Sequence, residues 1–258
     1  MKNILFPLLF LTLLFFSITI KSQSKYTPLP TVPDTYKVTS TTNLEYKYVP
    51  SIKELISSET FIPSDPNLYK NKRSDKKMRG NKVVPGKGLP KGADPLLNLG
   101  SKNNKKQNRN PILDFLTTSN TATPGDPTGE VGRDYYITAW NSSFRIYNLD
   151  GTPAIPAAGL GNLFTQDAGD PIALYDSEAD RYIISSMGNS AVNFAVSVSN
   201  DPVNDGWHVY NASSNAFPTG GFPDYPKYSI WSDAYYLTIN PANLFALERD
   251  KILNGDTS

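Results

Sequence analysis

The sequence contains no cysteine and only one histidine, His208. The missing cysteine excludes disulfide bonds, thiolate metal sites, a cysteine nucleophile and a lipid-modified cysteine anchor. A single histidine cannot form a multi-histidine metal centre, and any Ser-His-Asp triad would have to include His208. His208 stands in a run of strand-forming residues, where a lone histidine is more often structural than catalytic. We therefore expect no metal site built on histidine or cysteine.

Long apolar runs are also missing, except at the N-terminus, where Ile4–Ile20 is nearly uninterrupted. Lys2 precedes this run and the small residue Ser22 follows it, which is the pattern of a secretory signal peptide. An uncleaved anchor is the alternative, because the run is close to the ~17 residues that span a bilayer. We predict a cleaved signal peptide over residues 1–22 and a secreted or outer-surface protein without a membrane span.

The net charge of +1 hides two opposed blocks. Residues 70–109 carry thirteen Lys/Arg against two Asp, a balance of +11, whereas residues 110–258 carry six against seventeen acids, or −11. Basic segments can bind nucleic acid, but this one has no aromatic residue to stack on a base. We predict a disordered basic linker over residues 23–109 with no nucleic-acid partner, containing one short helix or strand around Ser51–Ile56.

Residues 110–258 read as an all-β domain. Short β-branched and aromatic runs recur between turn residues, and no helical pattern appears before the last dozen residues. The nine predicted strands are Tyr135–Trp140, Phe144–Leu149, Ile172–Tyr175, Tyr182–Met187, Phe194–Ser199, Trp207–Asn211, Tyr228–Trp231, Tyr235–Ile239 and Leu244–Leu247.

A repeat of the form Asp-x-Tyr-apolar begins at Asp134, Asp180 and Asp233, with offsets of 46 and 53 residues. A period of ~40–50 residues with four strands per unit is typical of β-propeller blades. We predict a partial β-propeller with four-stranded antiparallel blades over residues 110–258. About two and a half to three blades fit this length, whereas propellers close with ~4–8, so we expect the chain to be truncated. A β-sandwich is the alternative.

Several segments in fixed order carry a family resemblance. They are VPGKGLPKGADPLL (84–97), GDPTGEVGRDYYITAWNSSFRIYNLDGTP (125–153), GDPIALYDSEADRYIISS (169–186), FAVSVSNDPVNDGWHVY (194–210), FPDYPKYSIWSDAYYLTIN (222–240) and ALERDKILNG (246–255). Together they resemble the N-terminal, propeller-like region of large secreted bacterial surface proteins. Those proteins often continue into adhesive modules and end in a type IX secretion sorting domain. The resemblance implies an extracellular location and assigns no catalytic residue.

Acidic residues placed just before inner strands are the best candidate site. Asp170 and Asp224 precede equivalent strands, and Tyr225 and Lys227 are expected to line the same funnel. Such a carboxylate pair suits glycoside hydrolysis if the carboxyl groups lie ~5–9.5 Å apart. The structural alternative is that both acids simply begin strands in proline-containing turns.

We therefore predict a non-enzymatic module that binds an extracellular glycan or protein through Asp170, Asp224, Tyr225 and Lys227. The alternative is a glycoside-hydrolase-like propeller in which Asp170 and Asp224 are catalytic and sequence beyond this chain completes the ring. No cofactor is expected, although loop oxygens leave Ca²⁺ open.

Overall fold

The computed structural model describes residues 38–65, 111–117, 125–165, 169–188, 191–213, 223–240 and 243–256. The predicted signal peptide and the basic stretch 70–109 lie outside these residues. The chain divides into two compact units, Met1–Thr41 and Thr42–Ser258, and every helix and strand described below belongs to the second. Within the described ranges, no helix has the length and apolar character needed to cross a membrane.

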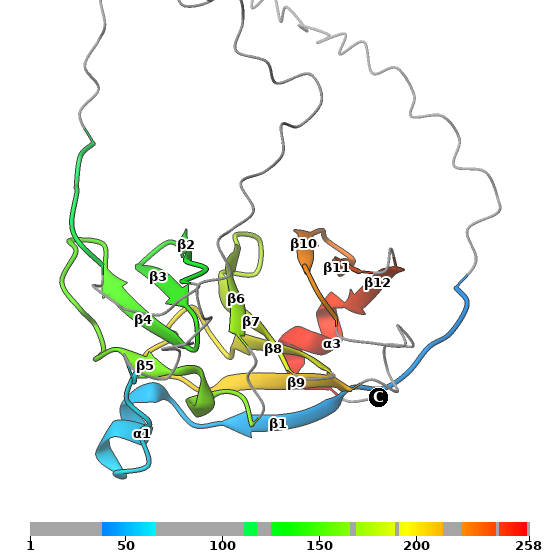
Figure 1. The fold of residues 1–258 in the computed structure, drawn as a ribbon, viewed down its shortest axis with the longest axis horizontal. Coiled ribbons are helices and arrows are strands. Elements are labelled where there is room, and N and C mark those ends of the chain that lie inside the picture. The colour runs from blue at the N-terminus through cyan, green and yellow to red at the C-terminus, as the bar shows by residue number, and fades with distance from the viewer. Residues whose placement is uncertain are drawn as a thin grey trace, which may run out of the picture. The chain divides into compact units, whose positions relative to one another are not determined.

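The described strands of the second unit form three antiparallel sheets (Figure 1). The first sheet contains β2 (Thr128–Val131), β3 (Tyr135–Trp140), β4 (Ser143–Asn148) and β5 (Ala158–Gly159), in that order. The second has the order β1-β9-β8-β7-β6, with β1 (Glu45–Val49), β6 (Gly169–Asp176), β7 (Arg181–Met187), β8 (Ala191–Ser197) and β9 (Trp207–Ser213). The third contains β10 (Lys227–Ile230), β11 (Ala234–Ile239) and β12 (Asn243–Glu248). The short helices are α1 (Ile52–Ser57), η1 (Leu160–Asn162) and α3 (Arg249–Asn254).

All nine predicted strands are present, each within three residues of its predicted ends, and the all-β class is confirmed. The strands from β6 to β9 follow one another across the second sheet, as the repeat predicts. The sequence did not reveal the strands β1, β2 and β5.

Strand β1 corrects the predicted domain boundaries. It pairs antiparallel with β9 along its whole length, from Glu45 opposite Asn211 to Val49 opposite Trp207 (Figure 1). The hydroxyl of Ser51 accepts a hydrogen bond from the backbone N–H of Glu54 at 3.0 Å and so caps helix α1. The expectation of a disordered linker over 23–109 therefore does not hold for residues 45–49, because β9 supplies the hydrogen bonds that this segment cannot form alone. The short helix or strand expected around Ser51–Ile56 is present as helix α1.

The second sheet is covered on both faces. One face packs against the first sheet through a core that includes Ile137, Ile146, Ile184 and Ala195. Its other face packs against the third sheet, where Phe194 meets the ring of Tyr235 at a centroid distance of 5.4 Å. Burial on both faces explains why β7 and β8 read as nearly continuous apolar runs instead of alternating ones.

The repeated tyrosine lies on the strand that directly follows β2, β6 and β10, at Tyr136 in β3, Tyr182 in β7 and Tyr235 in β11. The hydroxyl of Tyr182 reaches the hairpin between β2 and β3 and accepts from the backbone N–H of Tyr135 at 2.8 Å. The hydroxyl of Tyr235 donates to Asp176, where β6 ends, at 2.7 Å. The same motif position thus joins each later sheet to the hairpin of the sheet before it.

Candidate functional site

Three equivalent turns lead into the first strands of the three sheets. Each places a residue with positive φ directly before a proline: Asp126 (φ 39°), Asp170 (φ 47°) and Tyr225 (φ 60°). Left-handed backbone is uncommon for residues other than glycine, and for a bulky residue such as tyrosine it is a true outlier. Strained backbone of this kind tends to cluster at ligand sites, because packing must hold it in place. We call these three turns the proline turns.

The proline turns line a single cleft with a volume of about 490 Å³. Its walls are residues 126–128 of the first sheet, 170–172 and 174 of the second, and 225–228 of the third. The cleft therefore forms where the three sheets begin, and each sheet contributes the same part of its repeat.

The side chain of Asn141 connects two of the proline turns through hydrogen bonds. Its side-chain nitrogen donates to a carboxylate oxygen of Asp126 at 2.6 Å, and its side-chain oxygen accepts from the backbone N–H of Asp170 at 2.7 Å. Gly169 (φ 103°) must be glycine here, because a Cβ atom would lie 2.6 Å from that side-chain oxygen. Since Asn141 is buried, the distance between the two turns is fixed by packed groups.

The carboxyl groups of Asp170 and Asp126 are hydrogen-bonded to each other. Burial, this hydrogen bond and the negative charges of Asp126 and Asp224 raise the pKa of Asp170 to about 6, and the nearby positive charge of Lys227 opposes the rise. Because the pKa of Asp170 is raised to about 6, its carboxyl group can act as a hydrogen-bond donor when protonated and as an acceptor when ionised within the mildly acidic to neutral range.

The third sheet contributes an aromatic ring and a cation. The Tyr225 side chain is exposed, with 65% of its surface accessible, and the Lys227 ammonium lies over its ring at 3.9 Å from the centroid. The hydroxyl of Tyr228 is hydrogen-bonded to Ser185 at 2.6 Å, which fixes the base of this wall against the second sheet. The exposed ring is therefore held beside the carboxyl pair by a well-packed strand.

Three of the four sequence-predicted site residues, Asp170, Tyr225 and Lys227, line this cleft together. Asp224 does not line it, but the charge of Asp224 contributes to the raised pKa of Asp170. The sequence reading missed Asp126 and Asn141. Asp126 was recoverable, because Gly-Asp-Pro occurs at both 125–127 and 169–171. No sequence pattern pointed to Asn141, since its role depends on a turn that lies elsewhere in the sequence.

Two further chemical candidates were considered in the sequence, a metal site and His208. Across those residues, no three Asp, Glu, His or Cys side chains are grouped so as to hold a metal ion. His208 is half-buried on β9, where its Nδ1 atom is hydrogen-bonded to the hydroxyl of Tyr46 on β1 at 3.0 Å. The histidine thus helps to join β1 to β9.

Comparisons of the chain with models of protein families, with curated proteins and with solved structures found no match. Function therefore has to be argued from the cleft and the sheets that form it.

Proposed function

We propose that this protein is a secreted or cell-surface interaction module that binds a glycan in the cleft between its proline turns. In this proposal the three sheets are successive blades of a partial β-propeller, and the cleft lies where the innermost strands begin. The repeated tyrosine contacts and the strand order of the second sheet support this arrangement. The apolar N-terminal run supports export.

The observation that carries the proposal is the exposed ring of Tyr225 beside the Asp126–Asp170 carboxyl pair. A sugar ring presents C–H groups that pack on an aromatic face, and its hydroxyls donate to carboxylates. Lys227 adds a donor for sugar oxygens or for an acidic sugar. Concave sites with an aromatic wall and a few convergent polar groups are the usual form of a small-ligand site.

A glycan array followed by calorimetric titration tests the proposal. We expect the wild-type protein to bind at least one oligosaccharide, and Tyr225→Ser and Asp170→Asn each to weaken binding about tenfold or more, which corresponds to ~1.4 kcal/mol. Trp231→Ser is the matched control, because Trp231 is an equally exposed aromatic residue of the third sheet that does not line the cleft. Equal loss of binding in the control, or no binding to any glycan, would count against the proposal.

Glycoside hydrolysis is the second candidate, and the raised pKa of Asp170 favours it. A carboxyl group with a pKa of about 6 is suited to act as a general acid near neutral pH. Asp126 is hydrogen-bonded to Asp170 and therefore lies nearer than the ~5 Å that the second carboxylate of a glycosidase needs. Asp224 is the remaining candidate for the nucleophile or base, but its side chain does not line the cleft and would have to turn toward Asp170 to act there.

Assays of hydrolysis on a glycan panel separate the two candidates. Turnover by the wild-type protein that disappears in both Asp170→Asn and Asp224→Asn would support hydrolysis. Binding without turnover would support the interaction module.

A further inference from the structure

The contact between successive sheets occurs twice in this chain, each time through the repeated tyrosine and the hairpin of the preceding sheet. In the first instance, the hydroxyl of Tyr182 accepts from the backbone N–H groups of Asp134 and Tyr135, at 3.2 and 2.8 Å. In the second, the hydroxyl of Tyr235 reaches Asp176 at the hairpin of the second sheet. In each contact, the face of one sheet that bears the repeated tyrosine packs on the preceding sheet. It meets the hairpin of that sheet and the face that does not bear its own repeated tyrosine. Among the residues that the structure describes, two surfaces of the same kind remain unpaired with another sheet, one on the first sheet and one on the third.

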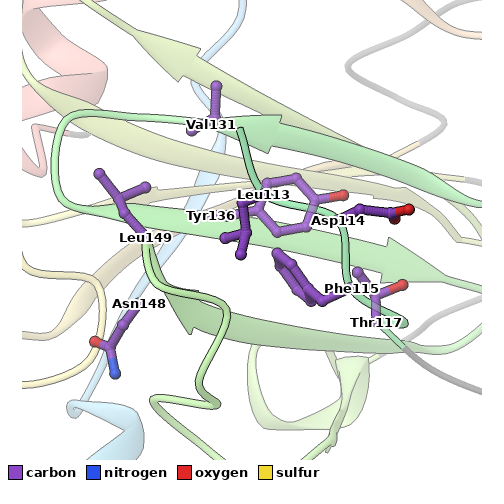
Figure 2. A pocket seen from close by; sticks show the side chains of 8 residues that line it. All are labelled: Leu113, Asp114, Phe115, Thr117, Val131, Tyr136, Asn148 and Leu149. Carbon is purple, nitrogen blue, oxygen red and sulfur yellow. The ribbon is translucent and has the colours of Figure 1, made fainter. Parts of the chain in front are cut away.

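The first unpaired surface is the tyrosine-bearing face of the first sheet. The strand register places Val131 opposite Tyr136, and Tyr136 opposite Tyr147, so these three side chains share one face. Residues 111–117 cover part of this face, where the ring of Phe115 packs edge-on against Tyr136 at 6.2 Å. Figure 2 shows the two rings close together, with Val131 and Leu149 nearby.

This surface is hollowed, and apolar side chains line it together with Asp114, Thr117 and Asn148. A pocket of about 300 Å³ lies between the Phe115 segment and the strands. Val131 is 57% exposed and Leu149 47% exposed beside it. In the part of the chain that the structure describes, the hydroxyl of Tyr136 has no hydrogen-bond partner, although Tyr182 and Tyr235 at the same motif position each have one.

The second unpaired surface is the outer face of the third sheet. Its β10–β11 hairpin corresponds to the hairpins that receive Tyr182 and Tyr235, and Trp231 at the start of this hairpin is 64% exposed. The register places Ser229, Tyr236 and Ala246 together on the same outer face. A face of mixed polarity with one large aromatic residue is typical of an interface that forms reversibly.

We propose that a second copy of this chain binds head to tail through these two surfaces. The Trp231 hairpin of one copy packs on the Val131–Tyr136–Leu149 surface of the next, and Trp231 enters the pocket beside Phe115. The choice of a second copy rests on the geometry of the chain, which already uses this pairing of faces between its own sheets. The contact is heterologous, since different surfaces of the two copies meet. It goes beyond glycan binding and does not use the cleft residues.

Sedimentation velocity of the full chain tests this proposal over about 1 to 500 μM, the range in which weak interfaces form. We expect the wild-type sedimentation coefficient to rise with concentration. Val131→Glu and Trp231→Ser should each abolish the rise. Leu149→Glu is a second variant of the first surface, so the result does not depend on the folding of one variant. Val38→Glu and Tyr225→Ser are matched controls that change exposed residues outside both surfaces and should associate like the wild type.

Mixing the two disabled variants gives the decisive result. Val131→Glu retains an intact Trp231 hairpin and Trp231→Ser retains an intact apolar surface, so an equimolar mixture should form a one-to-one complex and stop there. A wild-type chain that stays monomeric throughout the range overturns the proposal. Variants of either surface that associate like the wild type also overturn it. So does a mixture that remains monomeric, because two copies that meet through identical surfaces would not be rescued by mixing.

Discussion

The hydroxyl oxygen of Tyr182 lies 2.8 Å from the backbone nitrogen of Tyr135, 47 residues earlier in the chain. This bond links the β7 strand of the second sheet to the hairpin of the first, and the N–H of Asp134 donates to the same oxygen. The tyrosine side chain of one repeat thereby accepts hydrogen bonds from backbone N–H groups of the neighbouring repeat. The stability of the packed sheets should depend on this one hydroxyl.

Tyr182→Phe removes the acceptor and leaves two backbone N–H groups without their partner. We expect a loss of about 1 kcal/mol in the free energy of unfolding, since the two partly buried donors lose their acceptor. Urea denaturation followed by tyrosine and tryptophan fluorescence measures this change. Tyr136→Phe is the matched control at the same motif position and should cost less than ~0.5 kcal/mol. Equal costs in the two variants would show that the hydroxyl contact adds nothing.

The Asp176–Arg249 pair should be the most sensitive charged contact in the protein. Two guanidinium nitrogens of Arg249 donate to the buried carboxylate of Asp176 at 2.7 and 3.0 Å. Asp176→Asn leaves Arg249 buried without its anion and should cost about 3–5 kcal/mol. Glu178→Gln changes an exposed partner of the same arginine, 3.5 Å away, and should cost less than ~1 kcal/mol. Thermal denaturation of both variants decides the point, and similar costs would contradict this ranking.

The same pair gives a prediction about acid unfolding. Burial opposes ionisation of Asp176, but the hydrogen bonds from Arg249, Ala179 and Tyr235 prevail and lower its pKa below the usual value. The carboxylate therefore stabilises the fold above the unfolded-state pKa of about 3.9, and this contribution is lost as the pH falls through the lower folded-state pKa. Asp176→Asn should accordingly show a shallower loss of stability below pH ~4 than the wild type. An equally steep loss of stability below pH ~4 in the two proteins would refute this prediction.

Asp170 should have the opposite effect. Its pKa is raised to about 6, so the folded protein binds a proton that the unfolded chain releases at a pH near 4. Stability should therefore fall as the pH rises from about 4 to about 6, and the loss persists above that range. Asp170→Asn removes this fall and retains the backbone N–H that Asn141 binds. Stability curves of the two proteins between pH 4 and 7 should diverge in slope, and identical slopes would mean that the carboxyl is not perturbed.

Strand β1 should be visible in hydrogen exchange. Its pairing with β9 predicts slow exchange of the amides over Glu45–Val49, comparable to that of β9 itself. Mass spectrometry of peptides from these segments measures the rates. Exchange of residues 45–49 at the rate of an unstructured peptide would show that this segment is part of the disordered linker predicted from the sequence.

Much of the β architecture was predictable because its signals are local. Strands of the second sheet are buried on both faces, and such strands appear in a sequence as apolar runs between turn residues. The Asp-x-Tyr repeat likewise marked β3, β7 and β11, one strand in each sheet. The cleft was partly predictable for the same reason, since equivalent positions in a repeat occupy equivalent places in space.

What the sequence did not reveal depends on partners far along the chain. Glu45–Val49 becomes a strand through β9, about 160 residues later, and its own sequence shows only a short alternation. Strand β2 was hidden by Gly129, a residue unfavourable in strands, against which the side chain of Tyr136 packs closely. Asn141 is likewise defined by the two turns that it joins.

The cleft between the proline turns is the proposed ligand site, and a crystal structure of the protein with an oligosaccharide identified on the array is its sharpest test. We expect a sugar ring packed on Tyr225, with hydroxyls bonded to the carboxyl pair of Asp126 and Asp170. A sugar bound elsewhere on the protein, with this cleft filled only by water, would contradict it.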